Sequence, residues 1–412
     1  MFKYLLKIYF MRQIIFFFSL LFSVIQSVNA QSSCLPEGIS FYNQAQIDNF
    51  PSMYPGCVVI EGYVNIDTRN ASNVDSLIQI TLIQGDLQMS ENNITDLTGF
   101  ANLTGIYGNA WFSENSFSSF HGMESLGFVG GALGVSESFG LVSFDGLQNL
   151  DIIGGDLDVE ENDNLVNIDA LSGLDSLGGS LLLEDLPRLQ HLDALLGHDT
   201  IYGALVVDGL DSLLNLNGLL SIQHVDSTLK IRKNTLLSTI EGLANIQSIN
   251  GELIISQNDA LTSLTGIESI SSTSITELTI EESGQLNFCS LDNICSFLLD
   301  NFGPYTIETN DVGCNSALEI TNACNGGNDI EENLERTLTF YPNPASNNLT
   351  VDLGDVNGVN TIIKIYDGSS KLVFERQSTS TLMIDVSGFA KGMYSLELAT
   401  DEQVLRSQVI ID

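Results

Sequence analysis

The sequence predicts an all-β protein in which a parallel β-helix-like solenoid, with coils of about 24 residues, precedes a small C-terminal β-sandwich. The first observation is a repeat: Gly155, Gly179 and Gly203 lie 24 residues apart, and each opens a block with the same apolar pattern. The second is that residues 337–412 lose this period and alternate apolar and polar residues in short runs. A repeat of fixed length is typical of a solenoid, in which each coil contacts only its neighbours.

Within each block the apolar residues occupy fixed positions, which we count from the opening glycine. The block from Gly155 has them at positions 3, 5, 11, 14, 17, 20 and 23, namely Leu157, Val159, Leu165, Ile168, Leu171, Leu174 and Leu177. Positions 3 and 5 follow the period of a strand with one buried face. The later positions step by three, which we interpret as short extended segments and turns wound around a common axis. Stacked coils would pair their strands in parallel, about 4.8 Å apart.

Position 8 of the repeat is often asparagine, at Asn92, Asn115, Asn162, Asn234 and Asn258. Amide side chains stacked on successive coils can bond to one another and to the backbone of the turn. We therefore expect a structural ladder at this position and no catalytic role.

The N-terminus is typical of an exported protein. Residues 1–30 contain three basic residues, the apolar run "IIFFFSLLFSVI" and a small-residue cleavage site ending at Ala30, which together predict a signal peptide. All six cysteines follow it, an even number that suits an oxidising compartment. They lie near the two ends of the repeats, so we expect residues 31–324 to form a solenoid with cysteine-stapled caps. The polar residues 325–336 are expected to be a linker.

The charge balance excludes some classes of partner. Fifty-two acidic residues stand against 14 basic ones, for a formal net charge of −38. Such a surface disfavours nucleic acid and anionic lipid as partners. Apolar residues make up 43% of the chain, enough for a core, so the sequence is not an acidic disordered segment.

The first coil carries a family resemblance. The segment "GCVVIEGYVNI" (56–66), which follows Cys34 and "QAQIDNFPSMYPG", resembles the N-terminal coil of receptor L domains. The resemblance implies a right-handed β-helix, a Cys34–Cys57 disulfide that closes the first coil, and a binding-module architecture. Tyr63 and Val64 stand where the family prefers a polar residue and leucine. A leucine-rich-repeat horseshoe is the alternative, although its spacing around the asparagine is usually tighter.

The other end of the solenoid is also predicted to be capped. The segments "FCSLDNICSFLLDNF" and "GCNSALEITNAC" are each expected to contain a short helix. Four cysteines allow three pairings, and their spacing does not choose among them. Resemblance to the C-terminal caps of leucine-rich proteins implies Cys289–Cys314 and Cys295–Cys324. Zinc is the alternative ligand, disfavoured by export and by the missing CxxC spacing.

Residues 337–412 resemble the C-terminal sorting domain of the bacterial type IX secretion system. The resemblance rests on "YPNPASNNLTV", with Tyr341, Pro342, Asn343 and Pro344, and on Gly392 and Tyr394 of "GMYSLEL". It implies that the secretion machinery and its sortase are partners. It also implies passage across an outer membrane, removal of the domain, and a secreted or cell-surface location. The usual basic residue near the end is represented only by Arg406.

The outward positions of the strands are strongly charged. Position 7 is acidic in five successive coils, at Glu91, Glu114, Glu137, Glu161 and Asp185. The coil from Ser227 reverses the sign, with Lys230, Arg232 and Lys233. These cations either neutralise neighbouring acids or form part of a ligand site. The acids at Glu91 and Glu114 lie far from that coil, so we expect the column to stay uncompensated and to favour weak Ca²⁺ binding.

We therefore predict a non-enzymatic recognition or adhesion module that binds an extracellular glycan or protein on its sheet face. The candidate ligand-binding residues are Trp111, Asp158, Glu160, Glu184, Asp208, Lys230, Arg232 and Lys233. Trp111 has an alternative role, packing over Gly134 on the next coil. A Ca²⁺-dependent β-helix polysaccharide lyase and a passive stalk are the alternative functions. The four histidines lie at unrelated repeat positions and form no catalytic pattern, so no catalytic residue and no cofactor beyond weak Ca²⁺ is predicted.

Overall fold

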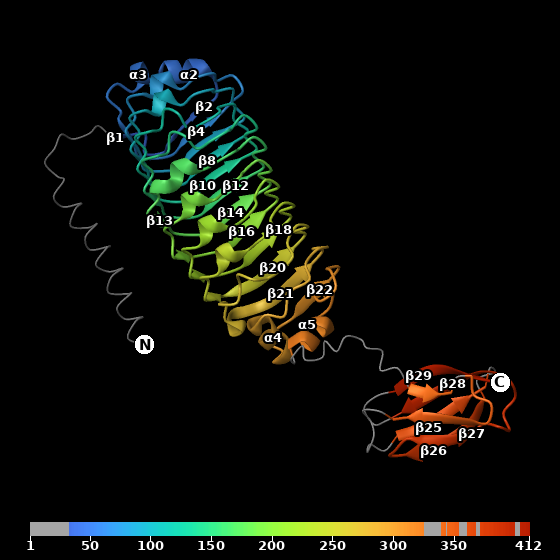
Figure 1. Cartoon of the computed structure of the whole chain (residues 1–412). Coiled ribbons are helices and arrows are strands. Elements are labelled where there is room, and N and C mark those ends of the chain that lie inside the picture. The colour runs from blue at the N-terminus through green and yellow to red at the C-terminus, as the bar shows by residue number, and fades with distance from the viewer. Residues whose placement is uncertain (1–32, 325–338, 343, 354–360, 368–370, 400–403) are drawn as a thin grey trace, which may run out of the picture. The chain divides into compact units, whose positions relative to one another are not determined.

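The computed structural model describes residues 33–324 and 339–412, except 343, 354–360, 368–370 and 400–403. The chain divides into two compact units, Met1–Asn325 and Gly326–Asp412. Each unit has its own apolar core, and Figure 1 shows the strands and helices of both. The expected signal peptide and linker lie outside the described residues.

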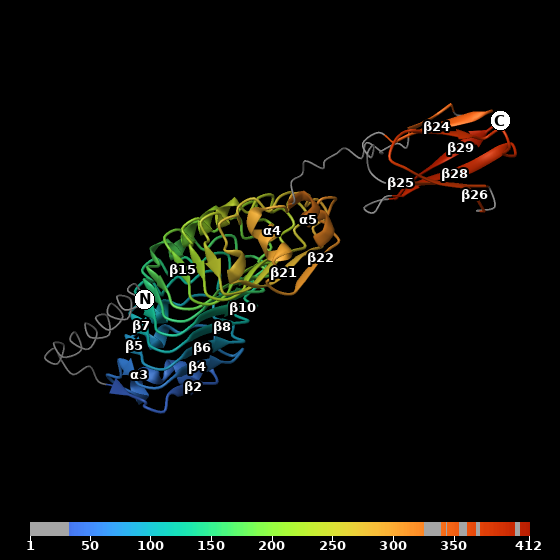
Figure 2. The ribbon, with the colours of Figure 1, turned by 90° about the horizontal axis from the view of Figure 1, so that it is seen from below.

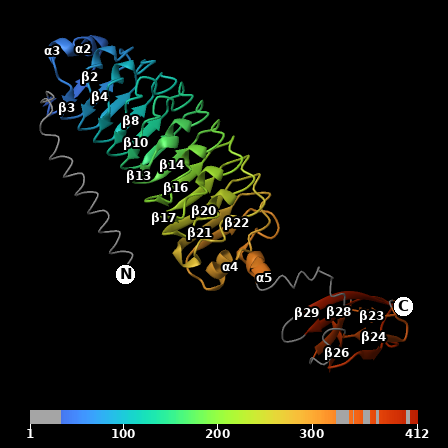
Figure 3. The same cartoon turned by 60° about the vertical axis from the view of Figure 1, so that its left-hand side comes forward.

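One long parallel sheet runs the length of the solenoid (Figure 3). Its 12 strands are β2 (Ile39–Phe41), β4 (Val64–Asp67), β6 (Leu87–Ser90), β8 (Ala110–Ser113), β10 (Leu133–Ser136), β12 (Leu157–Glu160), β14 (Leu181–Glu184), β16 (Leu205–Asp208), β18 (Leu229–Arg232), β20 (Gly251–Ser256), β21 (Ile275–Glu281) and β22 (Tyr305–Glu308). From β4 to β20 the strands pair in one constant register, in which Leu133 lies beside Leu157 and Leu157 beside Leu181, and the register shifts once between β20 and β21. Positions 3 to 6 of each coil thus form the predicted strand, and the all-β solenoid is confirmed.

A second column of short parallel strands lies across the core from this sheet (Figure 2). It comprises a seven-stranded sheet of β1 (Ser33–Cys34), β3 (Val59–Ile60), β5 (Leu82–Ile83), β7 (Gly105–Ile106), β9 (Phe128–Val129), β11 (Ile152–Ile153) and β13 (Ser176–Leu177), and a three-stranded sheet of β15 (Thr200–Ile201), β17 (His224–Val225) and β19 (Ser248–Ile249). Each strand has two residues, and from β5 onward each ends two residues before the next coil begins, at position 22 or 23.

Short 3₁₀ helices close the remaining side of several coils. They are η1 (Asp75–Leu77), η2 (Thr98–Phe100), η3 (Asp169–Gly173), η4 (Asp193–Leu195), η5 (Asn217–Leu219), η6 (Glu241–Leu243) and η7 (Ser272–Ser274). The expected short extended segments and turns are present in this part of the coils, and the 3₁₀ helices are an element that we did not predict from the sequence. An apolar spacing of three is also the period of a 3₁₀ helix, which has three residues per turn.

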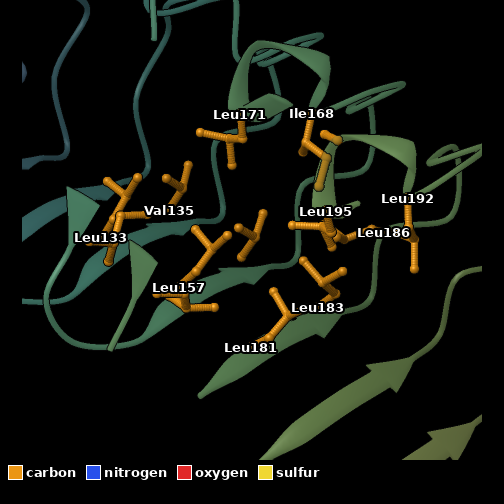
Figure 4. Close-up of a cluster of buried hydrophobic side chains, with 14 of the residues drawn as sticks. Leu133, Val135, Leu157, Ile168, Leu171, Leu181, Leu183, Leu186, Leu192 and Leu195 are labelled. Carbon is orange, nitrogen blue, oxygen red and sulfur yellow. The ribbon is translucent and has the colours of Figure 1, made fainter. Parts of the chain in front are cut away.

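The apolar positions of successive coils stack into one continuous core. Leu157 and Val159 are fully buried, as are Ile231 and Leu237 in a later coil. In Figure 4 the leucines of neighbouring coils point into the same interior from opposite sides. Burying a leucine stabilises the fold by roughly 1.5–3 kcal/mol. A coil gains this only when a neighbour covers it, so the repeats stabilise one another.

Two features hold the coils close together. The coil-opening glycines leave no room for a side chain: a Cβ on Gly62 would lie 2.1 Å from the backbone nitrogen of Gly38. The asparagines at position 8 form the expected ladder, in which Asn234 Oδ1 accepts from Leu210 N at 3.0 Å and Asn258 Oδ1 accepts from Asn234 N at 3.1 Å. These asparagines are fully buried, so their role is structural.

Both ends of the solenoid carry a cap. Helices α2 (Gln44–Asp48) and α3 (Phe50–Met53) cover the first coil, and α4 (Asp292–Leu299) and α5 (Ala317–Cys324) cover the last (Figure 1). The disulfides join Cys34 to Cys57, Cys289 to Cys314 and Cys295 to Cys324. These are the three pairs that the resemblances imply, and they leave no free thiol among the described cysteines for zinc.

The C-terminal unit is a sandwich of two antiparallel sheets. One contains β23 (Thr339–Tyr341), β24 (Asn348–Asp352) and β27 (Leu382–Asp385); the other contains β26 (Leu372–Ser378), β25 (Thr361–Tyr366), β28 (Gly392–Ala399) and β29 (Val404–Ile411). These strands fall in the segments that the alternating pattern predicted.

The N-terminal cap can be tested through its disulfide. Cys57 is 2% exposed, and its bond to Cys34 closes the first coil across 23 residues of sequence. Cys57→Ser is expected to lower the free energy of unfolding by about 2–4 kcal/mol, because the cross-link restricts the unfolded chain. Urea unfolding of the native and variant proteins measures this. The double variant Cys34→Ser plus Cys57→Ser, which leaves no free thiol at the cap, should lose a similar amount. An unchanged midpoint, or Cys34 found free by peptide mapping, contradicts the role of the cap.

Candidate functional site

The outward face of the 12-stranded sheet carries the predicted site residues. Positions 3 and 5 point into the core, so positions 4 and 6 point outward. Trp111 and Asp158 occupy position 4, whereas Glu160, Glu184 and Asp208 occupy position 6. Strand pairing places Glu160 directly beside Glu184, and Glu184 beside Asp208. The sheet therefore brings most of the predicted ligand-binding residues onto one continuous face.

Position 7 forms a sharp corner at the end of each strand. The backbone adopts the left-handed conformation at Glu91, Glu114, Glu137, Glu161, Asp185, Lys233, Gln257 and Glu282, with φ between 48° and 57°. Only Gly209 supplies a glycine at this corner, with φ of 76°. A side chain in this conformation costs about 1–2 kcal/mol relative to glycine. The corner directs the column of charged side chains outward, as the sequence predicts.

An open groove runs along these corners. Its larger section, of 970 Å³, is lined by Phe139, Glu161, Asp163, Asp185, Pro187, Gly209, Asp211, Lys233, Thr235, Gln257, Asp259 and Glu282. A second section, of 420 Å³, is lined by Arg69, Glu91, Asn92, Asn93, Glu114, Asn115, Ser116, Glu137, Phe139 and Gly140. Phe139 borders both sections and is 53% exposed.

The expectation that Glu91 and Glu114 stay uncompensated was wrong. Arg69 Nη2 lies 3.1 Å from Glu91 Oε2 and 3.8 Å from Glu114 Oε2. The guanidinium bridges two successive coils, because corner positions on stacked coils lie within reach of one long side chain. Both partners are well exposed, so each pair contributes less than about 1 kcal/mol.

The cations of β18 are paired with acids on the neighbouring strands. Lys230 Nζ lies 2.6 Å from Asp208 Oδ2 and 3.6 Å from Glu184 Oε2. Arg232 Nη1 lies 3.8 Å from the same Asp208 oxygen, and its Nε donates to Gln257 Oε1 at 3.1 Å. The Asp208 side chain is only 7% exposed, so its charge needs these partners. This geometry favours neutralisation as the role of Lys230 and Arg232, whereas Lys233 lines the groove.

The centre of the acidic face lacks such compensation. Burial raises the pKa of Asp158, and the carboxylates of Glu184 and Asp156 raise it further. Burial also raises the pKa of Glu160, with added repulsion from Asp158, Glu161, Glu184 and Glu137. Among the described residues, neither carboxylate has an ion-pair partner within 4 Å. The face therefore destabilises the fold locally at neutral pH.

The described residues contain no group of three or more histidine, cysteine or acidic side chains arranged to hold a metal ion. The weak Ca²⁺ site predicted at Glu91, Glu114, Glu137, Glu161 and Asp185 stays a prediction. A column with one carboxylate per coil spreads its oxygens along the solenoid, whereas Ca²⁺ takes six to eight oxygens around one point.

Trp111 is held flat over the next strand. A Cβ built on Gly134 would lie 1.9 Å from ring carbons Cε3 and Cζ3 of Trp111. The indole therefore occupies the space that a side chain at position 134 would need. This agrees with the alternative role of Trp111, in which its ring packs over Gly134. The residue remains 38% exposed, so one face of the ring is open to solvent. The structural role and a binding role are thus compatible.

A pocket that the sequence did not predict lies on the same face, two strands before β10. It has a volume of 300 Å³ and is lined by Ser40, Tyr63, Val64, Asn65, Asp86 and Gln88. Asn65 and Gln88 are outward position-4 residues, and Gln88 is the register partner of Trp111. The feature of the sequence that could have indicated this pocket was Tyr63, because receptor L domains usually have a polar residue at that position.

The sorting-signal residues lie at the end of β23 and in β28, which belong to different sheets of the C-terminal unit. Tyr341 ends β23 and is 54% exposed, and Pro342 and Pro344 are exposed after it, whereas Asn343 lies outside the described residues. Gly392 begins β28 with φ of 154°. Tyr394 is 6% exposed, and its hydroxyl donates to the Ala390 carbonyl at 2.7 Å, so it anchors the turn before β28.

Two family models match the chain. Residues 339–412 match the secretion system C-terminal sorting domain, and residues 56–120 match the receptor L domain. A search of curated proteins finds no match to this chain. In the part of the chain that the structure describes, no helix is both long and apolar enough to cross a membrane. The sorting domain identifies an exported protein of the type IX secretion system, located outside the cell or on its surface.

The acidic face predicts a pH-dependent gain in stability on removing one carboxylate. The raised pKa of Glu160 means that the folded protein binds this proton more tightly than the unfolded chain. Stability is therefore lost as pH rises through the folded pKa. At pH 7, Glu160→Gln should raise the free energy of unfolding by less than about 1 kcal/mol, the scale of one cross-strand charge pair, because Glu160 is exposed and solvent screens its repulsion.

Urea unfolding at neutral and acidic pH measures this effect. The gain should disappear below the unfolded pKa of glutamate, about 4.3. Glu241→Gln, at the exposed first residue of η6, is the control and should change stability little at either pH. A loss of stability at pH 7, or an equal gain at both pH values, contradicts the assignment.

The sorting domain predicts where the mature protein ends. We expect the extracellular form to terminate between Cys324 and Thr337, because the resemblance of residues 337–412 to type IX sorting domains implies that this domain is removed after export. Intact-mass measurement of the medium and surface fractions determines the C-terminus. A variant without residues 337–412 should stay inside the cell. An extracellular form that still ends at Asp412 contradicts removal.

Proposed function

We propose that this protein is an exported, non-enzymatic recognition module that binds an extracellular ligand on the outward face of its 12-stranded sheet. The observation that carries the proposal is the openness of this face. The strands pair in one register from β4 to β18, and each coil begins its next strand after 23 or 24 residues, so no inserted loop covers the sheet. The match of residues 56–120 to the receptor L domain supports a binding role.

Charge and surface chemistry also support recognition. The face combines an exposed aromatic ring at Trp111, carboxylates at Asp158 and Glu160, and small hydroxyl side chains at Ser113 and Ser136. Groups of these kinds, fixed on rigid strands, can bind a ligand without a large ordering cost. The sortase that would remove the sorting domain is the second proposed partner.

The observations favour this module over the lyase. An elimination reaction needs a free basic side chain beside its substrate, whereas Lys230 and Arg232 are both ion-paired with Asp208. A flat face without loops also provides no deep cleft for a polysaccharide. A passive stalk would require neither the exposed Trp111 nor the uncompensated carboxylates.

The proposal is tested by blocking the sheet face. The secreted protein is measured by biolayer interferometry against immobilised neutral polysaccharides, acidic polysaccharides, collagen and fibronectin. Ser136→Arg and Thr279→Arg place a large side chain on the outward face in β10 and β21. Ser176→Arg, exposed in β13 of the other sheet, is the matched control.

We expect at least one probe to bind, and at least one face variant to weaken that binding ten-fold or more while Ser176→Arg binds normally. The proposal is contradicted if the protein binds none of the probes, or if all three substitutions weaken binding equally.

A further inference from the structure

We propose that the first coils of the solenoid form a binding site for a neutral polysaccharide chain, built from Tyr63 and Trp111 with the amides of Asn65 and Gln88 between them. The inference rests on the proposed function and assigns it a ligand class and a place on the sheet. The site lies on β4, β6 and β8, which are adjacent in the large sheet (Figure 3).

Two aromatic rings border the site, and each lies over a glycine. The Trp111 ring covers Gly134, and the Tyr63 ring covers Gly38, where a Cβ would lie 2.5 Å from Tyr63 Cδ1. Each ring is thus held in place by the strand beneath it. Trp111 is 38% exposed and Tyr63 is 45% exposed, so each ring still presents surface to solvent. Rigid aromatic faces of this kind stack against the C–H faces of pyranose rings at a low entropic cost.

The rings lean toward opposite ends of the solenoid. Gly38 precedes Tyr63 by one coil, whereas Gly134 follows Trp111 by one coil. The 300 Å³ pocket lies over β2, β4 and β6, where neither ring covers Asn65 or Gln88. Tyr63 lines this polar hollow, and Trp111 lies on the next strand, β8, beside Gln88.

The hollow presents groups that suit sugar hydroxyls. Gln88 is exposed, and its amide makes no hydrogen bond to any described residue. Asn65 Oδ1 is buried and has no hydrogen-bond partner among the described residues. Asp86 Oδ1 accepts from Asn109 N at 2.7 Å, which orients the carboxylate at the rim. An amide can both donate to and accept from a sugar hydroxyl, whereas a carboxylate accepts from one, and a bound hydroxyl would supply the donor that Asn65 Oδ1 lacks.

The spacing of the coils suits an extended glycan. Asn65, Gln88 and Trp111 are consecutive register partners, so they are spaced along the solenoid axis by about 4.8 Å per coil. This distance is comparable with the length of one pyranose unit in an extended chain. A polysaccharide lying along the axis could therefore place successive sugars on successive coils. The position-6 residues beside this line are the small serines Ser90, Ser113 and Ser136, so no large side chain obstructs a chain that lies there.

Charge selects a neutral chain over an acidic one. The whole chain has a formal net charge of −38. The outward positions 4 and 6 from β4 to β12 include Asp67, Asp158 and Glu160 but no lysine or arginine. Arg69 lies at the corner, where it is paired with Glu91. An anionic polysaccharide would be repelled by this face, whereas the hydroxyls of a neutral chain can donate to its carboxylates.

Trp111 provides a direct readout, because the chain contains a single tryptophan. The secreted protein is titrated with oligosaccharides of β-1,4-glucan, β-1,3-glucan, xylan and mannan, and with oligogalacturonate as the acidic comparison. We expect a saturable change in tryptophan fluorescence with at least one neutral oligosaccharide and none with oligogalacturonate. Raising the salt concentration should leave the affinity nearly unchanged, since no charge pairs form with a neutral ligand.

Variants then locate the site by calorimetry. Trp111→Ala and Tyr63→Ala should each weaken binding about ten-fold, the effect of losing roughly one stacking contact. Gln88→Ala should weaken it less. Tyr202→Ala is the matched control, because Tyr202 is 52% exposed and follows β15 on the other sheet. Thermal melts establish that each variant is folded.

The outcomes separate this inference from the broader function. Absence of a fluorescence change with every neutral oligosaccharide overturns the site, as does equal binding by Trp111→Ala and Tyr202→Ala. If the immobilised probes show that the module binds a protein or an acidic polysaccharide, and Thr279→Arg abolishes that binding while Trp111→Ala does not, the recognition function stands and the polysaccharide site is wrong.

Discussion

The structure depends on backbone-to-backbone stacking of coils in constant register. Each coil buries its apolar residues only against its neighbours, and Leu157 is fully buried because coils lie on both sides of it. Parallel pairing about 4.8 Å apart leaves little room for a Cβ at the coil openings, where most coils have glycine and one has the small residue Ser227. The constraint also requires nearly equal coil lengths, since an inserted residue would shift every later strand out of register.

The same constraint explains the charge arrangement. Stacking places any repeated side chain beside its own copies, so an acidic position becomes a column of like charges. The solenoid relieves parts of this repulsion with single long cations that reach across coils, as Arg69 does for Glu91 and Glu114 and as Lys230 does for Asp208 and Glu184. The acids between these two groups have no such partner, and the pKa values of Asp158 and Glu160 are raised, first by burial and then by the neighbouring carboxylates.

Much of the solenoid could be predicted from its period, whereas most of the site could not. Alternation at Leu157 and Val159 indicates a strand, and the paired cysteines follow from the caps of similar families. The 3₁₀ helices were missed because a spacing of three fits two kinds of backbone. The reach of Arg69 and the pocket beside Tyr63 depend on side-chain direction and on which residues the register brings together, and neither is contained in a one-dimensional pattern.

In a solenoid without inserted loops, binding specificity must come from outward side chains that differ from those at the same position of neighbouring coils. Identical coils would present a uniform strip that binds nothing selectively, because every register of a ligand along the strip would be equivalent. The departures here are the glycines under Trp111 and Tyr63 and the single basic strand β18. Each breaks the repeat on the outward face while the inward positions remain apolar, so it costs the core nothing. A binding site is therefore expected where the outward side chains depart from the repeat. The neutral aromatic region before Asp158 is the first such place along the chain.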